Sequence, residues 1–209
     1  MIAHSANAGR LRTRAAVFAC VALAALVIDQ VTKVLALSFL SATDPVRIIP
    51  GLLSLRLVRN PGASLGMGSS ATWLISLFAL VASCALAWLA LRSVSMRWTV
   101  LLSLAFSGAV GNLIDRIVYA DGFLNGKVVD FLDYGWSVGN VADVFLVAAG
   151  VGIVLLIACN EPFSAGDLAD RGARRDGRDA AAQEDASGDP ARDGSREGSD
   201  AHEEGHAQR

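Results

Sequence analysis

Four long apolar segments alternate with polar segments along the first 160 residues of the chain. These segments cover about Ala15–Leu40, Ala71–Leu91, Trp98–Ile117 and Val141–Cys159. Each holds about 20 residues or more, and a helix that rises about 1.5 Å per residue then crosses a hydrocarbon core about 30 Å thick. The pattern predicts an all-α membrane protein with four transmembrane helices.

The polar segment 41–70 carries a different period. Apolar and polar side chains alternate from Leu53 to Leu57, as in a half-buried strand. The run follows the turn signal Pro50-Gly51 and leads into a glycine-rich stretch that begins at Asn60. We expect a small β-sheet in this first outer loop.

Charge divides the chain into two regions. The sequence has 209 residues, of which 53% are hydrophobic and 18% are charged, with a formal net charge of −2. Residues 1–160 hold no Glu, seven Asp and eleven Lys or Arg, so most acidic residues lie after Asn160. Residues 161–209 have few apolar side chains and are expected to be disordered. The net charge averages these regions, and nothing in the composition indicates a nucleic-acid partner.

Cysteine and histidine carry no recognisable ligand pattern. The three Cys all lie in or at the ends of apolar segments, without the spacing of a zinc site or a disulfide framework. The three His lie in the terminal regions, at positions 4, 202 and 206. We therefore expect no metal, no cofactor and no histidine-based catalysis in the apolar part of the chain.

The first apolar segment has a cleavable signal peptide as its alternative interpretation. The segment lacks an exit of small residues, and its helical pattern continues beyond Asp29. A lipoprotein signal that ends at Cys20 would divide the segment in its middle. A first transmembrane helix is the better interpretation.

Lys and Arg near the ends of the segments indicate the orientation. The short loop 92–97 carries two Arg and no acid, as expected of a cytoplasmic loop. This orientation gives a cytoplasmic segment 1–13, a membrane domain 14–160 with outer loops 41–70 and 118–140, and a cytoplasmic tail 161–209. All seven Asp of the membrane domain then lie in its outer half.

Carboxylates concentrate between Gly108 and the start of the fourth segment. Five of the seven Asp lie there, at Asp115, Asp121, Asp130, Asp133 and Asp143. Asn112 and Asn140 each precede an Asp by three residues, a helical spacing at which the amide can orient the carboxylate. Two neighbouring Asp cannot easily both ionise, so such a pair supplies a general acid and a general base together.

The residues alone leave the members of the pair open among Asp115, Asp130, Asp133 and Asp143. Apolar neighbours would raise the pKa of Asp130, which favours it as the partner that holds the proton. Arg116 follows Asp115 and would keep it charged. The structural alternative for Asp143 is a capping role in the first turn of its helix.

Lys33 has two possible partners. Asp29 lies four residues before it, which predicts an ion pair with a structural or substrate-orienting role. Ser64 could form a Ser–Lys dyad with Lys33 on residue types alone, although nothing in the sequence aligns the two side chains.

Five short motifs together resemble the lipoprotein signal peptidases, also called type II or prolipoprotein signal peptidases. They occur in the order of that family, on four spans: Asp29-Gln-Val-Thr-Lys33, Asn60-Pro-Gly-Ala-Ser64, Gly108-Ala-Val-Gly-Asn-Leu-Ile-Asp-Arg116, Val128-Val-Asp-Phe131 and Asn140-Val-Ala-Asp143. Any one tetrapeptide is a weak signal, but five in order are specific, and they cover about residues 15–160.

The resemblance implies an aspartic endopeptidase of the bacterial plasma membrane, with its active site on the extracytoplasmic side. It would cleave diacylglyceryl-modified prolipoproteins before the lipidated cysteine and act as a monomer among membrane lipids. Asp130 and Asp143 would be the catalytic residues. The resemblance assigns supporting or substrate-binding roles to Asp29, Lys33, Asn60, Gly62, Asn112, Asp115, Arg116 and Asn140.

The chain departs from the family pattern in its second outer loop. The interval between Asp130 and Asp143 is shorter than usual, and the interval between Asp115 and Asp130 is longer. Gly139 stands where the family usually has Phe. These departures fall in the second outer loop and leave the motif residues themselves intact.

Two other classes of function remain for comparison. A small transporter or proton-conducting subunit could use Asp29, Asp115 and Asp143 as a relay, but a relay needs acids through the whole membrane depth. A scaffold without catalysis would have no use for the paired Asn-x-x-Asp motifs.

Overall fold

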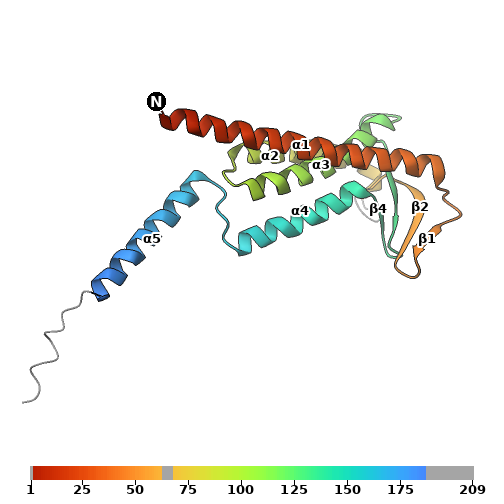
Figure 1. Cartoon of the computed structure of the whole chain (residues 1–209). Helices are drawn as coiled ribbons and strands as arrows, with labels where there is room; N and C mark the ends of the chain where they lie inside the picture. Colours follow the sequence, from red (N-terminus) through yellow and green to blue (C-terminus); the bar gives the residue numbers. More distant parts are fainter. Residues whose placement is uncertain (1, 63–67, 187–209) are drawn as a thin grey trace, which may run out of the picture. The chain divides into compact units, whose positions relative to one another are not determined.

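A computed structural model describes residues 2–62 and 68–186 of the chain (Figure 1). Two compact units are distinguished, one up to Ala165 and one from Gly166 onward. The elements are α1 (Ile2–Phe39), β1 (Val46–Ile49), β2 (Leu53–Asn60), η1 (Ser69–Ala71), α2 (Thr72–Arg92), α3 (Met96–Val118), β3 (Val128–Asp133), β4 (Val138–Gly139), α4 (Val141–Ala158) and α5 (Ala165–Ala186).

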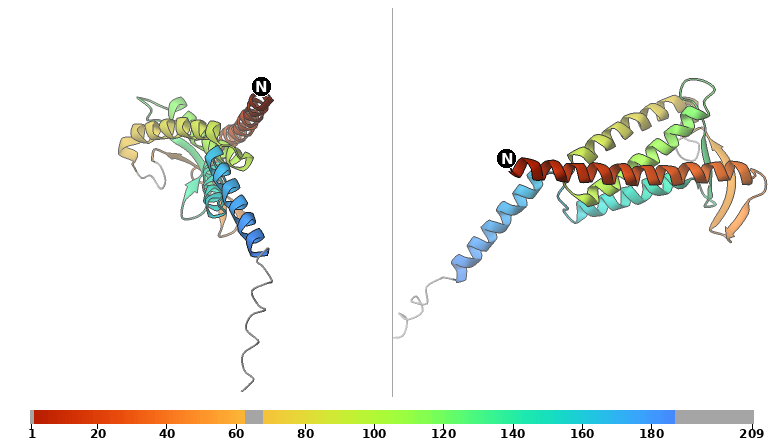
Figure 2. Two further views of the ribbon diagram at one scale, coloured as in Figure 1. Left: turned by 90° about the vertical axis from the view of Figure 1, so that its left-hand side faces the viewer. Right: turned by 45° about the horizontal axis from the view of Figure 1, so that its top comes forward.

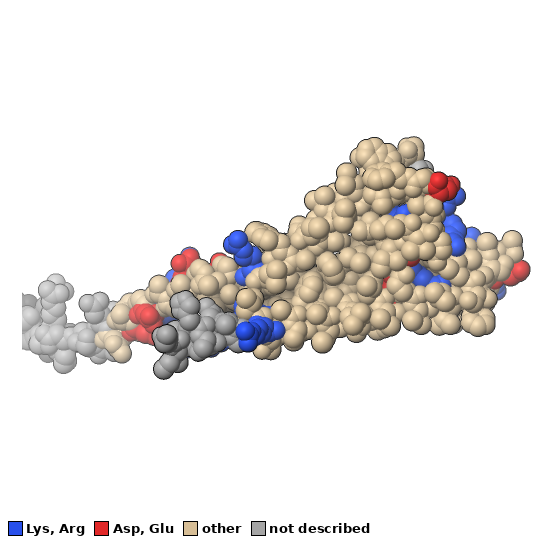
Figure 3. All heavy atoms as spheres, turned by 90° about the horizontal axis from the view of Figure 1, so that it is seen from above, with Lys and Arg blue, Asp and Glu red and all other residues tan. Residues whose placement is uncertain are grey.

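Four helices of the first unit are long and apolar enough to cross a membrane. Their membrane-length segments are Arg10–Phe39, Thr72–Arg92, Met96–Val118 and Val141–Ala158. These bounds confirm the four helices that the apolar segments predict, although α1 extends back to Ile2 through the expected N-terminal segment 1–13. Charged side chains gather at the ends of this unit, and the long flank between them is almost free of charge (Figure 3).

Helix α3 is the central helix of the first unit and packs against α1, α2 and α4 (Figure 2). Eleven of its 23 residues are buried, whereas α2 has four buried residues among 21 and α4 has two among 18. The outer helices therefore expose many apolar side chains, as helices that face lipid do. This arrangement makes α3 the frame on which the neighbouring helices are positioned.

Small residues on α3 allow its neighbours to approach closely. The Ser107 hydroxyl donates a hydrogen bond of 3.1 Å to the Ala22 carbonyl of α1. At Gly108, an added Cβ would lie only 2.6 Å from the Ala142 carbonyl of α4. Such small residues are the usual means of close packing between helices in membranes. They bring α1 and α4 against the same part of α3.

A four-stranded antiparallel sheet in the order β1-β2-β3-β4 lies at one end of the helices (Figure 1). The first outer loop supplies β1 and β2, which confirms the strand predicted from the alternation after Leu53. The second outer loop supplies β3 and β4, which the sequence does not reveal. In β2 and β3, Val58 is paired with Asp130, next to an irregularity that separates the Leu55 and Val58 pairings.

The second unit contains the helix α5, in a region for which the composition predicts disorder. Apolar side chains are few there, but Ala and Arg are good helix formers. Asp167 and Arg171, and Asp170 and Arg174, are also spaced as stabilising i, i+4 pairs. Residues 187–209 of the expected disordered tail lie outside the described residues.

Candidate active site

Asp130 and Asp143 are joined through one residue, Asn140. The Asn140 side-chain amide donates a hydrogen bond of 2.7 Å to Asp130 Oδ1, and its backbone N–H donates one of 3.1 Å to Asp143 Oδ2. The chain runs from β3, which carries Asp130, through the short hairpin to β4 and into α4, which carries Asp143. The hairpin and the start of α4 therefore bring the two carboxylates to opposite sides of one asparagine.

Asp143 also takes part in the cap of its own helix. Asn140 is the N-cap of α4, and its side-chain oxygen accepts a hydrogen bond of 3.1 Å from the Asp143 N–H. With the Asn140 N–H donating to Asp143 Oδ2, this forms a capping box. The second oxygen, Oδ1, accepts a hydrogen bond of 2.9 Å from the Asn112 amide of α3. Asp143 therefore caps its helix, and the same contacts hold its carboxylate in one orientation.

Asp130 is a buried carboxylate with a perturbed pKa. It is 2% exposed, and Asn60 of β2 donates a hydrogen bond of 2.9 Å to its Oδ2. Burial raises the pKa of Asp130 from its ordinary value of 3.8 to about 6, although the hydrogen bonds from Asn60 and Asn140 oppose this rise. Within this net shift of the Asp130 pKa, the charge of Asp143 acts in the same direction as burial, and the charge of Lys33 opposes it. This is the direction expected for the proton-holding member of a pair.

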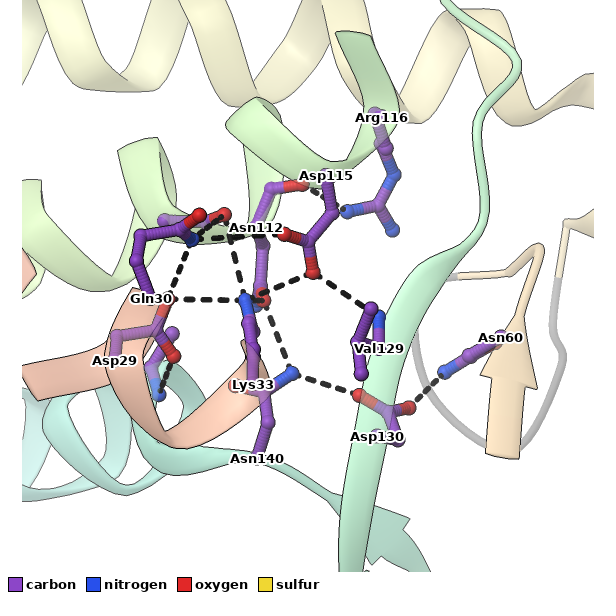
Figure 4. A network of polar contacts seen from close by, with 12 residues as sticks. Asp29, Gln30, Lys33, Asn60, Asn112, Asp115, Arg116, Val129, Asp130 and Asn140 are labelled. Carbon is purple, nitrogen blue, oxygen red and sulfur yellow. Dashed lines mark hydrogen bonds and ion pairs between the residues drawn. The ribbon is translucent and has the colours of Figure 1, made fainter. Parts of the chain in front are cut away.

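Lys33 lies at the centre of a second, buried cluster of carboxylates. Its ammonium nitrogen is 3.0 Å from Asp29 Oδ2 and 3.0 Å from Asp115 Oδ2, with all three side chains almost fully buried (Figure 4). Lys33 also donates a hydrogen bond of 3.1 Å to Asn112 Oδ1, to which the Asn140 amide donates at 3.0 Å. The amides of Asn112 and Asn140 therefore connect the Lys33 cluster to the pair formed by Asp130 and Asp143.

The two carboxylates of the Lys33 cluster also hold the backbone next to Asp130 and Asp143. Asp115 Oδ2 accepts a hydrogen bond of 3.0 Å from the N–H of Val129, the residue before Asp130. Asp29 Oδ1 accepts one of 2.9 Å from the N–H of Ala142, the residue before Asp143. Each of these buried Asp thus positions the peptide unit adjacent to one member of the candidate pair.

Arg116 differs from its expected role as the partner of Asp115. Its guanidinium donates hydrogen bonds of 2.9 Å to the Gly62 carbonyl and 3.2 Å to the Asn112 carbonyl. The Gly62 N–H in turn donates a hydrogen bond of 2.9 Å to Asn60 Oδ1. Arg116 therefore holds the turn after β2 and, through it, the asparagine that donates to Asp130.

A groove of about 280 Å³ reaches Asp130 along the sheet. Its lining includes Asn60 and Val58 from β2, and Asp133 and Trp136 from the β3–β4 hairpin. Arg56 lines the groove as well and forms an ion pair of 3.0 Å with Asp133. An extended peptide that lies in this groove would pass the Asp130 carboxylate.

The structure brings together the ten residues that the motifs nominate, from α1, β2, the following turn, α3, β3 and α4. Ser64, the other nominated partner of Lys33, lies outside the described residues. Sequence reasoning missed Gln30, whose amide donates 3.1 Å to Asp29 Oδ2 and 3.2 Å to the Gly111 carbonyl. Its polarity within an apolar segment was the available signal.

Gly111 is a further residue that the motifs do not single out. A Cβ at this position would collide with the Asp29 carboxylate, so only glycine lets Asp29 pack against α3. Within the ranges that the structure describes, no group of three or more His, Cys, Asp or Glu side chains is placed to hold a metal ion. The site consists of carboxylates, amides, one lysine and one arginine.

Comparison with known proteins places this site in a family. The family described as "Signal peptidase (SPase) II" matches residues 21–159. A lipoprotein signal peptidase of Bifidobacterium longum subsp. infantis is 69% identical over 160 residues, which cover 77% of this chain and 88% of the relative. One from Bifidobacterium adolescentis is 63% identical over 178 residues, covering 85% and 95% respectively.

A solved structure agrees with this assignment. It is a bacterial membrane enzyme determined by the in meso method at 2.3 Å resolution. The two chains are 27% identical, with a TM-score of 0.62, and the match covers 70% of this chain and 92% of the other. On its sequence, its four spans and the arrangement of its motifs, the chain belongs to the signal peptidase II family.

Proposed function

We propose that this multi-pass bacterial membrane protein is an aspartic endopeptidase that removes signal peptides from prolipoproteins, with Asp130 and Asp143 as its catalytic pair. Membership of the signal peptidase II family supports the reaction and the substrate class. The observation that carries the assignment of the pair is the double contact of Asn140, whose amide and backbone N–H bind one carboxylate each.

The reaction requires one carboxylate with a proton and one without. Two carboxylates that share a donor cannot both ionise at the same cost, so the pair retains one proton. The ionised member removes a proton from a water molecule, and the resulting oxygen attacks the scissile carbonyl. The protonated member donates its proton to the carbonyl oxygen, giving a tetrahedral intermediate.

The second half of the reaction returns the protons. The carboxyl group that took the proton from water gives it to the leaving amine nitrogen, and the other carboxylate takes a proton from a hydroxyl of the intermediate as the carbon–nitrogen bond breaks. The new carboxyl and amine groups then depart, and the pair again shares one proton. The raised pKa of Asp130, about 6, supports Asp130 as the member that holds the proton before attack. Because a coupled pair titrates as a unit, a pH–rate profile reports the pKa values of the pair rather than of Asp130 alone.

The remaining residues position the pair. Asp115 and Asp29 hold the peptide units next to the two catalytic residues, and Lys33 balances their charges. Accurate positioning of reacting groups can account for several orders of magnitude in rate. The lipid chains of the substrate would stay in the bilayer, and the peptide before its lipidated cysteine would lie along the sheet.

The active site faces the extracytoplasmic side in this proposal. Arg92 at the end of α2 and Arg97 in the first turn of α3 support a cytoplasmic position for that end of the helices. The sheet and the catalytic pair lie at the opposite ends of the same helices. Labelling of single cysteines from each side of intact cells tests the orientation: a cysteine at Asp44 reacts with an impermeant reagent, and one at Arg97 does not.

The proton-relay alternative fits the arrangement poorly. Asp29, Asp115 and Asp143 gather around one network at a single end of the helices. Across the described parts of the four spans, the remaining half of the membrane depth holds no carboxylate. A relay without acids in that half would have no path for the proton.

One experiment tests the proposal directly. The purified chain in detergent is assayed with a lipidated prolipoprotein, beside Asp130→Asn, Asp143→Asn and the control Asp44→Asn, an exposed loop residue. We expect both site variants to lose cleavage while their thermal unfolding stays cooperative, and the control to cleave normally. Full activity in either site variant contradicts the pair, and loss of activity on addition of a chelator contradicts a mechanism carried by the carboxylates alone.

A further inference from the structure

A second hollow lies beside the groove, where α2 begins and α3 ends, and the two share Arg59 and Pro61 in their linings. Its volume is about 740 Å³, and its lining includes Arg59, Trp73, Tyr119, Asp121 and Lys127. These residues come from β2, α2, the C-terminal cap of α3 and the segment that leads into β3. Asp130 and Asp143 do not line it, so the hollow is separate from the candidate catalytic pair.

Positive charge dominates this hollow. Arg59 and Lys127 are exposed, and in the described part of the chain neither forms an ion pair. Asp121 is the acidic residue in the lining, and its Oδ1 already accepts a hydrogen bond of 2.7 Å from the Asn125 amide. Lys and Arg side chains gather visibly at this end of the first unit (Figure 3).

Arg59 is held in place by an aromatic ring. Its guanidinium carbon lies 4.3 Å from the centre of the Tyr119 ring, which is within the range of a cation–π contact. A guanidinium that stacks by its face still has N–H donors along its edge, and these match the oxygens of a phosphate group. The stacking therefore reduces the freedom of Arg59 while it leaves the group suited to bind an anion.

The hollow lies at the level where hydrocarbon meets water. Trp73 is the second residue of α2 and Tyr119 directly follows α3, and they are 45% and 38% exposed. Trp and Tyr prefer this level of a membrane, where phospholipid headgroups lie. Large apolar side chains continue from here along the exposed surfaces of both helix ends, at Leu74, Leu77, Ile117 and Val118.

We propose that this hollow binds the phosphate-containing headgroup of an anionic phospholipid. Arg59 and Lys127 contact the phosphate, Trp73 and Tyr119 line the headgroup, and the acyl chains lie along the apolar ends of α2 and α3. A soluble phosphate would satisfy the two cations, but it would make no use of the aromatic and apolar side chains beside them. Lipid binding in this hollow involves neither Asp130 nor Asp143.

Lipid retention measures this proposal without any substrate. The full chain is stripped of lipid in detergent and mixed with equimolar phosphatidylglycerol and phosphatidylcholine, and the bound lipids are counted by native mass spectrometry. We expect the unmodified chain to retain phosphatidylglycerol preferentially. Each basic residue near a headgroup raises the affinity for an anionic lipid by a factor of about five. Lys127→Gln should therefore reduce the preference for phosphatidylglycerol about fivefold, and Arg59→Gln/Lys127→Gln should reduce it about 25-fold.

A matched double variant controls for net charge. Arg47→Gln/Arg92→Gln removes the same charge from residues that do not line the hollow, and it should keep the preference. An unmodified chain without preference, or an equal loss in the control variant, overturns the proposal. Displacement of phosphatidylglycerol by equimolar inorganic phosphate also overturns it, because the site would then recognise a soluble anion. If the double variant unfolds, exposed Lys127→Gln alone decides the outcome.

Discussion

The Lys33 ammonium nitrogen lies 3.0 Å from the Asp115 carboxylate, with both side chains 2% exposed. The same nitrogen lies 3.0 Å from Asp29, so one cation balances two carboxylates in a buried position. Those carboxylates hold the backbone N–H groups of Val129 and Ala142, which precede the proposed catalytic residues. The ion pairs of Lys33 therefore stabilise the packing of α1 on α3 and also hold the backbone beside the proposed catalytic pair.

Replacing Lys33 with Met should destabilise the protein by about 3–5 kcal/mol, because it leaves buried carboxylates without their cation. Thermal or denaturant unfolding in detergent measures the loss. The matched control is Arg56→Met, which breaks the partly exposed ion pair with Asp133 and should cost at most about 1 kcal/mol. Equal losses in the two variants would show that the buried cluster does not carry this energy.

Asn140 caps α4 and is proposed to position the catalytic pair, and two substitutions separate these roles. Asn140→Ala should cost about 1 kcal/mol of stability through the lost cap and reduce kcat about a hundredfold. Asn140→Ser keeps a capping oxygen, so it should restore the stability but not the rate, because serine cannot reach Asp130. Unfolding and kcat are measured on both variants. Recovery of the rate in Asn140→Ser would assign the effect to the helix cap alone.

Gly139 lies against Asp143 of the proposed catalytic pair. A Cβ at this position would lie 2.8 Å from Asp143 Oδ2, an oxygen already held by the Asn140 N–H. Gly139→Ala should therefore displace the carboxylate and lower kcat by about tenfold to a hundredfold, with a smaller effect on KM. Gly150→Ala, at a position on α4 with open space around the added Cβ, is the control. An unchanged kcat in Gly139→Ala would mean that Asp143 tolerates the shift.

The raised pKa of Asp130 predicts a pH-dependent cost in stability. Between its ordinary pKa of 3.8 and its folded pKa of about 6, the folded state binds more protons than the unfolded state. Stability from this group is complete below the lower pKa and is lost as the pH rises through the higher one. The side chain at position 130 in Asp130→Asn does not titrate. The free energy of unfolding of this variant, relative to that of the unmodified chain, should therefore rise by about 2 kcal/mol between about pH 4 and about pH 7.

Unfolding free energies of the two proteins at both pH values check this prediction. The comparison cancels the carboxylates outside the pair, which titrate alike in both proteins. A constant difference between the two proteins across this range would mean that Asp130 is not held as a high-pKa carboxylate in the folded state.

The helices and the nominated residues were predictable from local features of the chain. An apolar run of about 20 residues has only one stable form across a membrane, since a helix satisfies all of its backbone groups internally. Strand β2 was predictable from its alternation. Strands β3 and β4 were not, because Val128–Leu132 is apolar on both sides of Asp130 and β4 has only two residues. Pairing with β2, a long-range contact, decides their structure.

The sequence by itself determined four spans, a set of ten candidate site residues and, through the order of their motifs, the family. Only the tertiary structure decided how those residues divide: Asp115 pairs with Lys33 and not with Arg116, and Asn112 binds Asp143. The reason is physical. In a buried polar network every donor and acceptor needs a partner, and which partners are within about 3 Å depends on helix packing around α3 rather than on spacing along the chain.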